Sequence, residues 1–122
     1  MPTPRTRLGN WGKELAGRFL EESGYSILDT NYRCRYGEVD IVARDGEELV
    51  FAEVRTRHGG GFGAPEESLS AAKVRRLVTT CQDYIQRRSE EDTEWRIDLV
   101  CVHLDRGGEA TRIHHLRHAI QL

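Results

Sequence analysis

The sequence has few cysteines, no long apolar run and no excess of charge of one sign. Its three cysteines, Cys34, Cys81 and Cys101, are far apart and form no CxxC pair, which argues against a disulfide framework and a zinc ribbon. No stretch approaches the roughly 18 continuous apolar residues that a membrane-spanning helix needs. The basic start of the chain is not followed by an apolar segment, so it does not resemble a secretory signal. We therefore expect a cytoplasmic protein without a membrane partner.

Lysine and arginine together number 18 against 20 acidic residues, which gives a formal net charge of −2. This balance does not indicate a polyanionic partner for the whole surface, so nucleic-acid binding would need a local basic patch. The chain has 122 residues, of which 38% are hydrophobic and 31% charged, as is typical of one soluble globular unit. We interpret residues 1–122 as a single domain.

Hydrophobic periodicity and turn signals predict two helices and five strands. A first helix is expected at about residues 10–23, ended by Gly24. A second, amphipathic helix is expected from Pro65 to about Arg88, after a glycine-rich loop at residues 58–64. The strands are expected at residues 25–34, 38–44, 48–56, 95–104 and 111–118, with a turn at 44–47 and a solvated connector at 89–94.

The predicted order of elements is α-β-β-β-α-β-β. Short turns join the first three strands, which favours an antiparallel meander. A helix that crosses between the third and fourth strands would place these two parallel in the same sheet. The fold class is therefore α/β, with a mixed central sheet flanked by helices.

Two neighbouring predicted strands carry acidic side chains on a common face. Alternate residues of a strand share a face, so Glu38 lies with Asp40, and Glu53 lies with Arg55. A turn centred on residues 45–46 would oppose Glu38 to Glu53 and leave Asp40 on their diagonal. The opposite face would then hold the apolar residues Val39, Ile41, Val50, Ala52 and Val54.

The repulsion between carboxylates placed this way has to be relieved. Two of them about 5 Å apart repel by roughly 3 kcal/mol at an effective dielectric constant near 20. A raised pKa, a salt bridge from Arg55 or another base, or a divalent cation would relieve the repulsion. A cation would also activate water and stabilise a phosphoryl transition state. A simpler interpretation stays open, in which Glu38 and Asp40 line a solvated face of an antiparallel sheet.

Several blocks resemble the YraN-type family of uncharacterised small bacterial proteins: residues 12–20, 31–33, 37–43, 50–57 and 95–100, with Pro65 and Lys73. That family resembles compact restriction-endonuclease-like domains and is similar in pattern to archaeal Holliday junction resolvases. The resemblance implies a restriction-endonuclease-like core and a metal-dependent endonuclease that hydrolyses phosphodiester bonds in DNA, branched DNA included. It also suggests a homodimer, because a two-fold junction suits a two-fold protein.

In such nucleases the core reads Asp, then Glu-x-Lys. By position, the resemblance implies that Asp40 and Glu53 hold Mg²⁺ or Mn²⁺, with the carbonyl of Val54 as a further ligand and Glu38 as an auxiliary acid. Arg55 stands where the family has lysine. Arginine stays protonated, so Arg55 would offset phosphate charge but would not act as a base.

A second departure from the family pattern lies in the first helix. The family pattern Gly-Glu-x-x-Ala reads Gly12-Lys13-Glu14-Leu15-Ala16 here, so a base replaces an acid at Lys13. Lys13 and Arg55 would then lock the carboxylates into ion pairs. The alternative function is therefore a catalytically impaired, nuclease-fold module that binds nucleic acid without cutting it.

A local basic patch for DNA can be drawn from Lys13, Arg57, Lys73 and Arg76. A solvated helix face explains the bases of the second helix equally well. The glycine-rich loop either closes over a phosphate or simply connects a strand to a helix.

Histidines near the end of the sequence do not suit a zinc site. His114 and His115 would point to opposite faces of a strand, and no acid or cysteine follows His118 at ligand spacing. Asp98, inside an apolar strand, is interpreted as a buried acid satisfied by Arg96 or by backbone donors.

Overall fold

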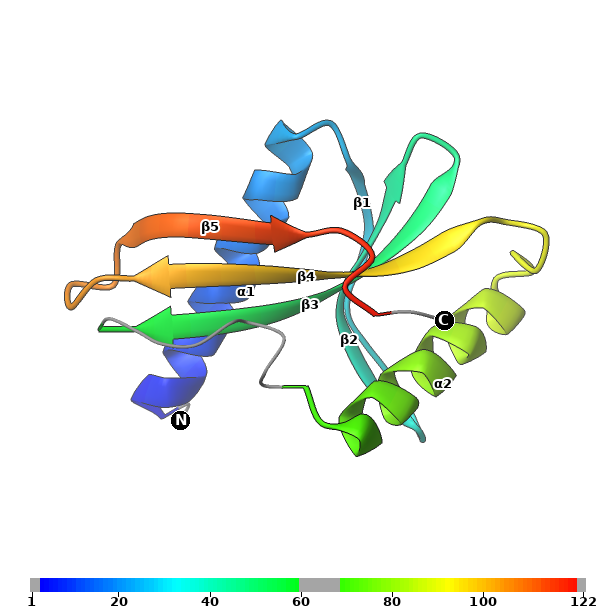
Figure 1. Cartoon of the computed structure of the whole chain (residues 1–122), viewed down its shortest axis with the longest axis horizontal. Helices are drawn as coiled ribbons and strands as arrows, with labels where there is room; N and C mark the ends of the chain where they lie inside the picture. The colour runs from blue at the N-terminus through cyan, green and yellow to red at the C-terminus, as the bar shows by residue number, and fades with distance from the viewer. Residues whose placement is uncertain (1–2, 60–68, 121–122) are drawn as a thin grey trace.

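The computed structural model describes residues 3–59 and 69–120 (Figure 1). Neither helix within these residues combines the length and apolar character that a membrane crossing requires. In chain order the elements are α1 (Pro4–Glu22), β1 (Ser26–Cys34), β2 (Gly37–Asp45), β3 (Glu48–His58), α2 (Ala71–Arg87), β4 (Trp95–Leu104) and β5 (Ala110–Leu116). The predicted order α-β-β-β-α-β-β is confirmed.

The five strands form one sheet in the order β1-β2-β3-β4-β5. All neighbours are antiparallel except β3 and β4, which run parallel because α2 carries the chain across between them. Figure 1 shows β1 and β2 bending strongly away from the other three strands. The predicted mixed sheet, with β4 as a buried interior strand, is confirmed.

Both helices begin at different residues from those predicted. Helix α1 begins at Pro4 rather than near residue 10, because the hydroxyl of Thr3 accepts the N–H of Thr6 at 3.1 Å and caps it. Helix α2 begins at Ala71 rather than at Pro65, with Ser70 as its cap. Residues 65–67, which were expected in its first turn, lie outside the described residues, as does most of the glycine-rich loop.

The sheet carries an apolar layer on each face. Alternate residues of β3 divide between the two layers, as strand geometry requires. The α1 layer joins Ala16 and Leu20 of the helix to Val50, Ala52 and Val54 of β3, among others. The α2 layer joins Leu77 and Cys81 of the helix to Leu49 and Phe51 of β3, among others. The prediction that Val39 shares a face with Ile41 is wrong, because Val39 packs in the α2 layer and Ile41 in the α1 layer.

The turn between β2 and β3 differs by one residue from the prediction. Asp45 is the partner of Glu48, so the turn consists of Gly46 and Glu47, and Gly46 takes a left-handed φ of 62° that suits glycine. Ile41 is therefore opposite Ala52, where the β2–β3 ladder ends. The predicted opposition of Glu38 and Glu53 is wrong, because the glycine sits at the first turn position and shifts the register.

Asp98 is a satisfied buried acid, as predicted. It accepts hydrogen bonds from Arg96 Nε at 2.9 Å and from the backbone N–H of His118 at 3.1 Å. His115 Nε2 also lies 2.8 Å from its other oxygen, a contact that the sequence did not indicate. Burial alone would raise the pKa of Asp98, but the bonds from His115 and Arg96 outweigh burial and lower its pKa.

Gly12 lets α1 approach β3 closely. A Cβ atom built on Gly12 would lie 2.0 Å from Thr56 Oγ1 and 3.1 Å from Thr56 Cβ. Gly17 lies on the same helix with no atom within 4 Å of such a Cβ. The glycine at the start of the first family-like block is therefore required by packing against a neighbouring strand.

We expect Gly12→Ala to lower the free energy of unfolding by about 1–3 kcal/mol, because the added methyl group overpacks the α1–β3 contact. Gly17→Ala is the matched control and should be neutral or stabilising, since alanine favours a helix. Urea denaturation measures both changes. Thr56→Ala combined with Gly12→Ala should recover part of the loss; no recovery would contradict a clash with Thr56.

Candidate functional site

A cavity of about 380 Å³ lies where the end of the β1–β2 hairpin meets both helices. Every side chain that the sequence assigned to catalysis lines it, together with three of the four assigned to nucleic-acid binding. Its lining residues are Lys13, Gly37, Glu38, Asp40, Glu53, Val54, Arg55, Lys73, Arg76 and Leu77. They come from α1, β2, β3 and α2, so the chain assembles this cavity only when it folds.

Asp40 occupies the fork where β2 and β3 separate. The ladder between these strands ends at Ile41 and Ala52, and the next donor on β3, the N–H of Val54, bonds instead to Asp40 Oδ2 at 2.7 Å. A side-chain carboxylate thus replaces a backbone carbonyl as acceptor, and a charge-assisted bond of this kind is stronger than a neutral one. Asp40 is only 6% exposed, so this bond fixes its position.

Glu53 lies beside Asp40 and is equally buried. Lys73 of α2 places its Nζ 2.7 Å from Glu53 Oε2, whereas Arg55 Nη2 is 3.7 Å from the same oxygen. The stronger ion pair of Glu53 is therefore with a lysine from a helix and not with the arginine two residues along the strand. Lys73 was expected to contact DNA, and its contact with Glu53 was not predicted.

Lys13 of α1 compensates the other carboxylate. Its Nζ lies 3.3 Å from Asp40 Oδ1 and 3.1 Å from the side-chain oxygen of Asn31 on β1. The expectation that Lys13 forms an ion pair with the acids is thus met at Asp40. Each of these two carboxylates has its own lysine, and the two lysines come from helices on opposite faces of the sheet.

The pKa of Glu53 departs strongly from its ordinary value. Burial raises the pKa of Glu53 from its ordinary value of 4.5 to about 7, the negative charge of Asp40 and a hydrogen bond to it add to the rise, and Lys73 opposes it. A carboxyl group with a pKa near 7 takes up or releases a proton close to neutral pH. That property suits a group that binds a cation or exchanges a proton.

Two other predicted site residues lie apart from this pair. Glu38 is on the rim of the cavity, is exposed, and forms an ion pair with Arg33 Nε at 3.0 Å. Arg57 lies beyond the cavity along β3, where it interacts with the thiol of Cys101. Within the described ranges, no three His, Cys, Asp or Glu side chains are gathered closely enough to hold an ion together.

Lys73 could have been recognised from its place in α2. It is the third residue of the helix, where the positive end of the helix dipole disfavours a lysine, and the first turn carries no acid to offset it. A lysine in the first turn of a helix therefore suggests an acidic partner on another element of the fold. The predicted helix start at Pro65 concealed this signal, because it placed Lys73 in the helix interior.

A larger hollow, of about 880 Å³, lies between the first half of α1 and the turn before β5. Its charged and aromatic lining includes Arg7, Trp11, His58 and Arg106, and its one acid among the described residues is Glu109. No carboxylate pair forms there. Size alone therefore does not identify the site, and the chemistry favours the cavity around Asp40.

Comparison with known proteins supports the family resemblance that the sequence blocks indicated. The model of the uncharacterised protein family UPF0102 matches residues 12–102, which is most of the chain and includes every lining residue of the cavity. The chain belongs to the UPF0102 family. The resemblance to YraN-type proteins is thereby confirmed.

Curated UPF0102 proteins align with this chain along nearly their full length. A UPF0102 protein of Roseiflexus castenholzii is 41% identical over 118 residues, covering 96% of this chain and 95% of that protein. One from Chloroflexus aurantiacus is 41% identical over 121 residues, covering 98% of both chains. UPF0102 protein GSU0650 of Geobacter sulfurreducens is 40% identical, covering 94% of this chain and 89% of that protein.

In metal-free protein, a carbon-13 NMR titration of the Glu53 carboxyl group should have its midpoint near pH 7. Asp40→Asn removes the adjacent negative charge and should lower the midpoint, whereas Lys73→Met removes the adjacent positive charge and should raise it. A wild-type midpoint near 4.5 would contradict the burial of Glu53 beside Asp40.

The same raised pKa sets the sign of a stability effect. An unfolded carboxyl group ionises near pH 4.5, whereas folded Glu53 keeps its proton up to about pH 7. The contribution of Glu53 to the free energy of unfolding therefore falls as pH rises through this window, and Glu53→Gln should abolish that fall.

Proposed function

We propose that this protein is a metal-dependent phosphodiesterase that acts on DNA, with Asp40 and Glu53 at its catalytic centre. The observation that carries the proposal is the buried pair of adjacent carboxylates at the β2–β3 fork, inside a cavity that Lys13, Arg55, Lys73 and Arg76 also line. Acids for a cation and bases for a phosphate are the two halves of a phosphodiesterase site.

The donor set fits a small divalent cation. Asp40 and Glu53 offer carboxylate oxygens, and Mg²⁺ is commonly held by one or two carboxylates with water and substrate phosphate completing its shell. Burial and the adjacent charge of Asp40 raise the pKa of Glu53, and added positive charge, which a divalent cation would supply, would stabilise its ionised form. When bound, Mg²⁺ or Mn²⁺ would activate water and polarise the phosphate, with the carbonyl of Val54 as a further oxygen donor.

The basic side chains of the cavity would have different roles. Arg55 and Arg76 would hold the phosphate and offset the charge that develops on it. Arg55 would not act as a base, because arginine stays protonated. Lys73 is an amine in contact with Glu53, and it suits the role that the lysine of the Glu-x-Lys pattern has in such nucleases. Lys13, paired with Asp40, would have to release that carboxylate when a cation binds.

A second candidate is a DNA-binding module without catalysis. It is favoured by the ion pairs of Lys13 with Asp40 and of Lys73 with Glu53, which already neutralise both acids. In that case the cavity would bind a phosphate through its bases, and no divalent cation would enter. A metal titration distinguishes the two functions.

Calorimetric titration with Mn²⁺ should show binding to the wild-type protein and none to Glu53→Gln or Asp40→Asn. Asparagine at position 40 keeps an acceptor for the N–H of Val54, so the fork should stay intact. Lys13→Met should bind Mn²⁺ about tenfold more tightly, since a competing positive charge is removed.

The matched control is Glu14→Gln. Glu14 directly follows Lys13 in the sequence, is exposed and forms an ion pair with Arg18, so this substitution removes an acid outside the cavity. It should leave Mn²⁺ affinity unchanged. Absence of heat from the wild type at millimolar Mn²⁺ would favour the binding module over the phosphodiesterase.

Incubation with single-stranded, duplex and four-way-junction DNA in Mn²⁺ or Mg²⁺ should yield cleavage by the wild type. Asp40→Asn should reduce the rate by at least about hundredfold, because the proposed cation loses a charged ligand. Gel analysis of end-labelled strands measures both rates. Equal cleavage by Asp40→Asn would assign the activity to a contaminant and refute the catalytic role of Asp40.

A further inference from the structure

The tip of the β1–β2 hairpin carries an exposed aromatic ring. Among the large apolar side chains of residues 3–59 and 69–120, only Leu28 and Tyr36 are exposed, and Tyr36 is 37% exposed. Arg35 Nη2 donates to the Tyr36 hydroxyl at 2.6 Å, and its guanidinium carbon lies 4.9 Å from the ring centroid. Arg35 therefore contacts both the ring and the hydroxyl group of Tyr36 at the surface.

Exposed arginines lie on the hairpin and on the neighbouring helix α2. Arg33 and Arg35 lie on the hairpin itself and are exposed, as are Arg75 and Arg76 of α2. The hairpin end is in contact with α2, because a Cβ built on Gly37 would lie 3.9 Å from the Cβ of Arg76. Three exposed guanidinium groups, those of Arg33, Arg35 and Arg76, thus lie at or beside the hairpin end, and one of them, Arg33, is paired with Glu38 at 3.0 Å. The two remaining charges attract a polyanion at this place.

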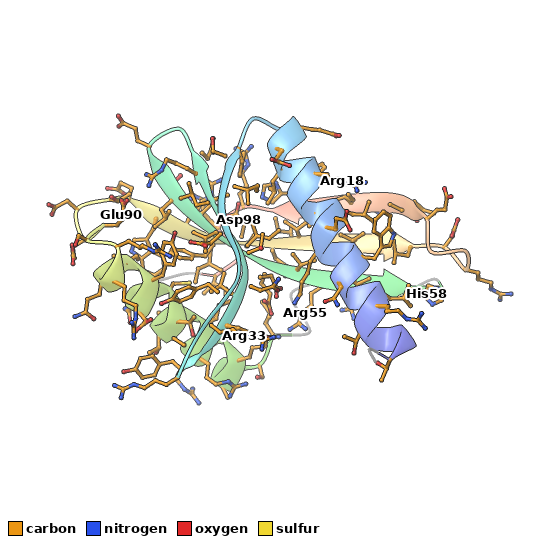
Figure 2. All side chains as sticks on the ribbon, turned by 180° about the vertical axis from the view of Figure 1, so that it is seen from behind. Arg18, Arg33, Arg55, His58, Glu90 and Asp98 are labelled. Atoms are coloured by element: carbon orange, nitrogen blue, oxygen red, sulfur yellow. The ribbon has the colours of Figure 1, made fainter. Side chains whose placement is uncertain are left out.

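The tip is also continuous with the candidate site. Gly37 and Glu38, which directly follow Tyr36, line the same cavity as Asp40, Glu53 and Arg76. In the view of Figure 2, Arg33 lies near the hairpin end and Arg55 lies between the hairpin and α1. A strand that lies along Arg33 and Arg35 would therefore lead toward the carboxylates.

We infer that the hairpin tip, residues 33–37, binds an unpaired stretch of DNA by stacking a base on Tyr36 while Arg33 and Arg35 contact its phosphates. The choice of DNA as the ligand and the direction of the bound strand, toward the carboxylate cavity, rest on the proposed function. Base stacking on an exposed aromatic ring needs an open base face, and a continuous duplex covers both faces of its bases. The tip therefore favours DNA with unpaired bases over uninterrupted duplex.

Binding should be measured in EDTA, so that no cleavage occurs, with a single-stranded oligonucleotide that carries 2-aminopurine and with the matching duplex. Tyr36→Ala should weaken single-strand binding about tenfold and abolish the quenching of 2-aminopurine that stacking produces. Tyr36→Phe keeps the ring and should retain both, and duplex affinity should change little in either variant. Arg35→Ala should reduce the slope of log affinity against log salt by about 0.7, the value of one phosphate contact.

Leu28→Ala is the matched control, because Leu28 is the other large apolar side chain that is exposed in the described part of the chain, and it lies toward the opposite end of β1. It should leave affinity and quenching unchanged. Wild-type affinity in Tyr36→Ala, an equal loss in Leu28→Ala, or a preference of the wild type for duplex would each overturn the inference. Tyr36-dependent binding in EDTA, together with no cleavage by the wild type in Mg²⁺ or Mn²⁺, would refute the phosphodiesterase and keep this binding site. Cleavage in Mg²⁺ or Mn²⁺ by a protein whose single-strand binding is the same in Tyr36→Ala would keep the phosphodiesterase and refute this binding site.

Discussion

The arrangement of the site depends on one hydrogen bond, from the N–H of Val54 to the carboxylate of Asp40. It forms where the β2–β3 ladder stops, and it gives a buried backbone donor an acceptor that the departing strand no longer provides. The opening of the fork brings Asp40 beside Glu53 and exposes both acids to the two helices. The same irregularity places Val39 and Ile41 in different apolar layers.

Two buried carboxylates side by side would be costly without nearby positive charge. The fold supplies that charge from both faces of the sheet, with Lys13 from α1 and Lys73 from α2. Helix α1 reaches the sheet because Gly12 allows close contact with Thr56, and Lys73 is positioned by the Ser70 cap at the start of α2. Packing and capping thus determine the electrostatics of the cavity.

The same cavity accommodates both functions considered for this UPF0102 protein. Its acids suit a divalent cation, and its bases suit a phosphate. What separates a phosphodiesterase from a binding module is whether a cation displaces the lysines from the acids. The hairpin tip adds a surface next to the cavity whose aromatic ring and arginines suit an unpaired DNA strand in either case.

The sequence by itself determined the order of the elements, the mixed sheet and the short list of acids, since each follows from local periodicity, turn residues and family-like blocks. It also indicated that Asp98 is paired in the core. It misplaced the β2–β3 register by one turn residue and missed the partnership of Lys73 with Glu53. Only the tertiary structure decided the β2–β3 register and the contact of Lys73 with Glu53. The fork between β2 and β3, and a contact between a helix and a strand far apart in the sequence, both arise from long-range packing, which leaves no local pattern.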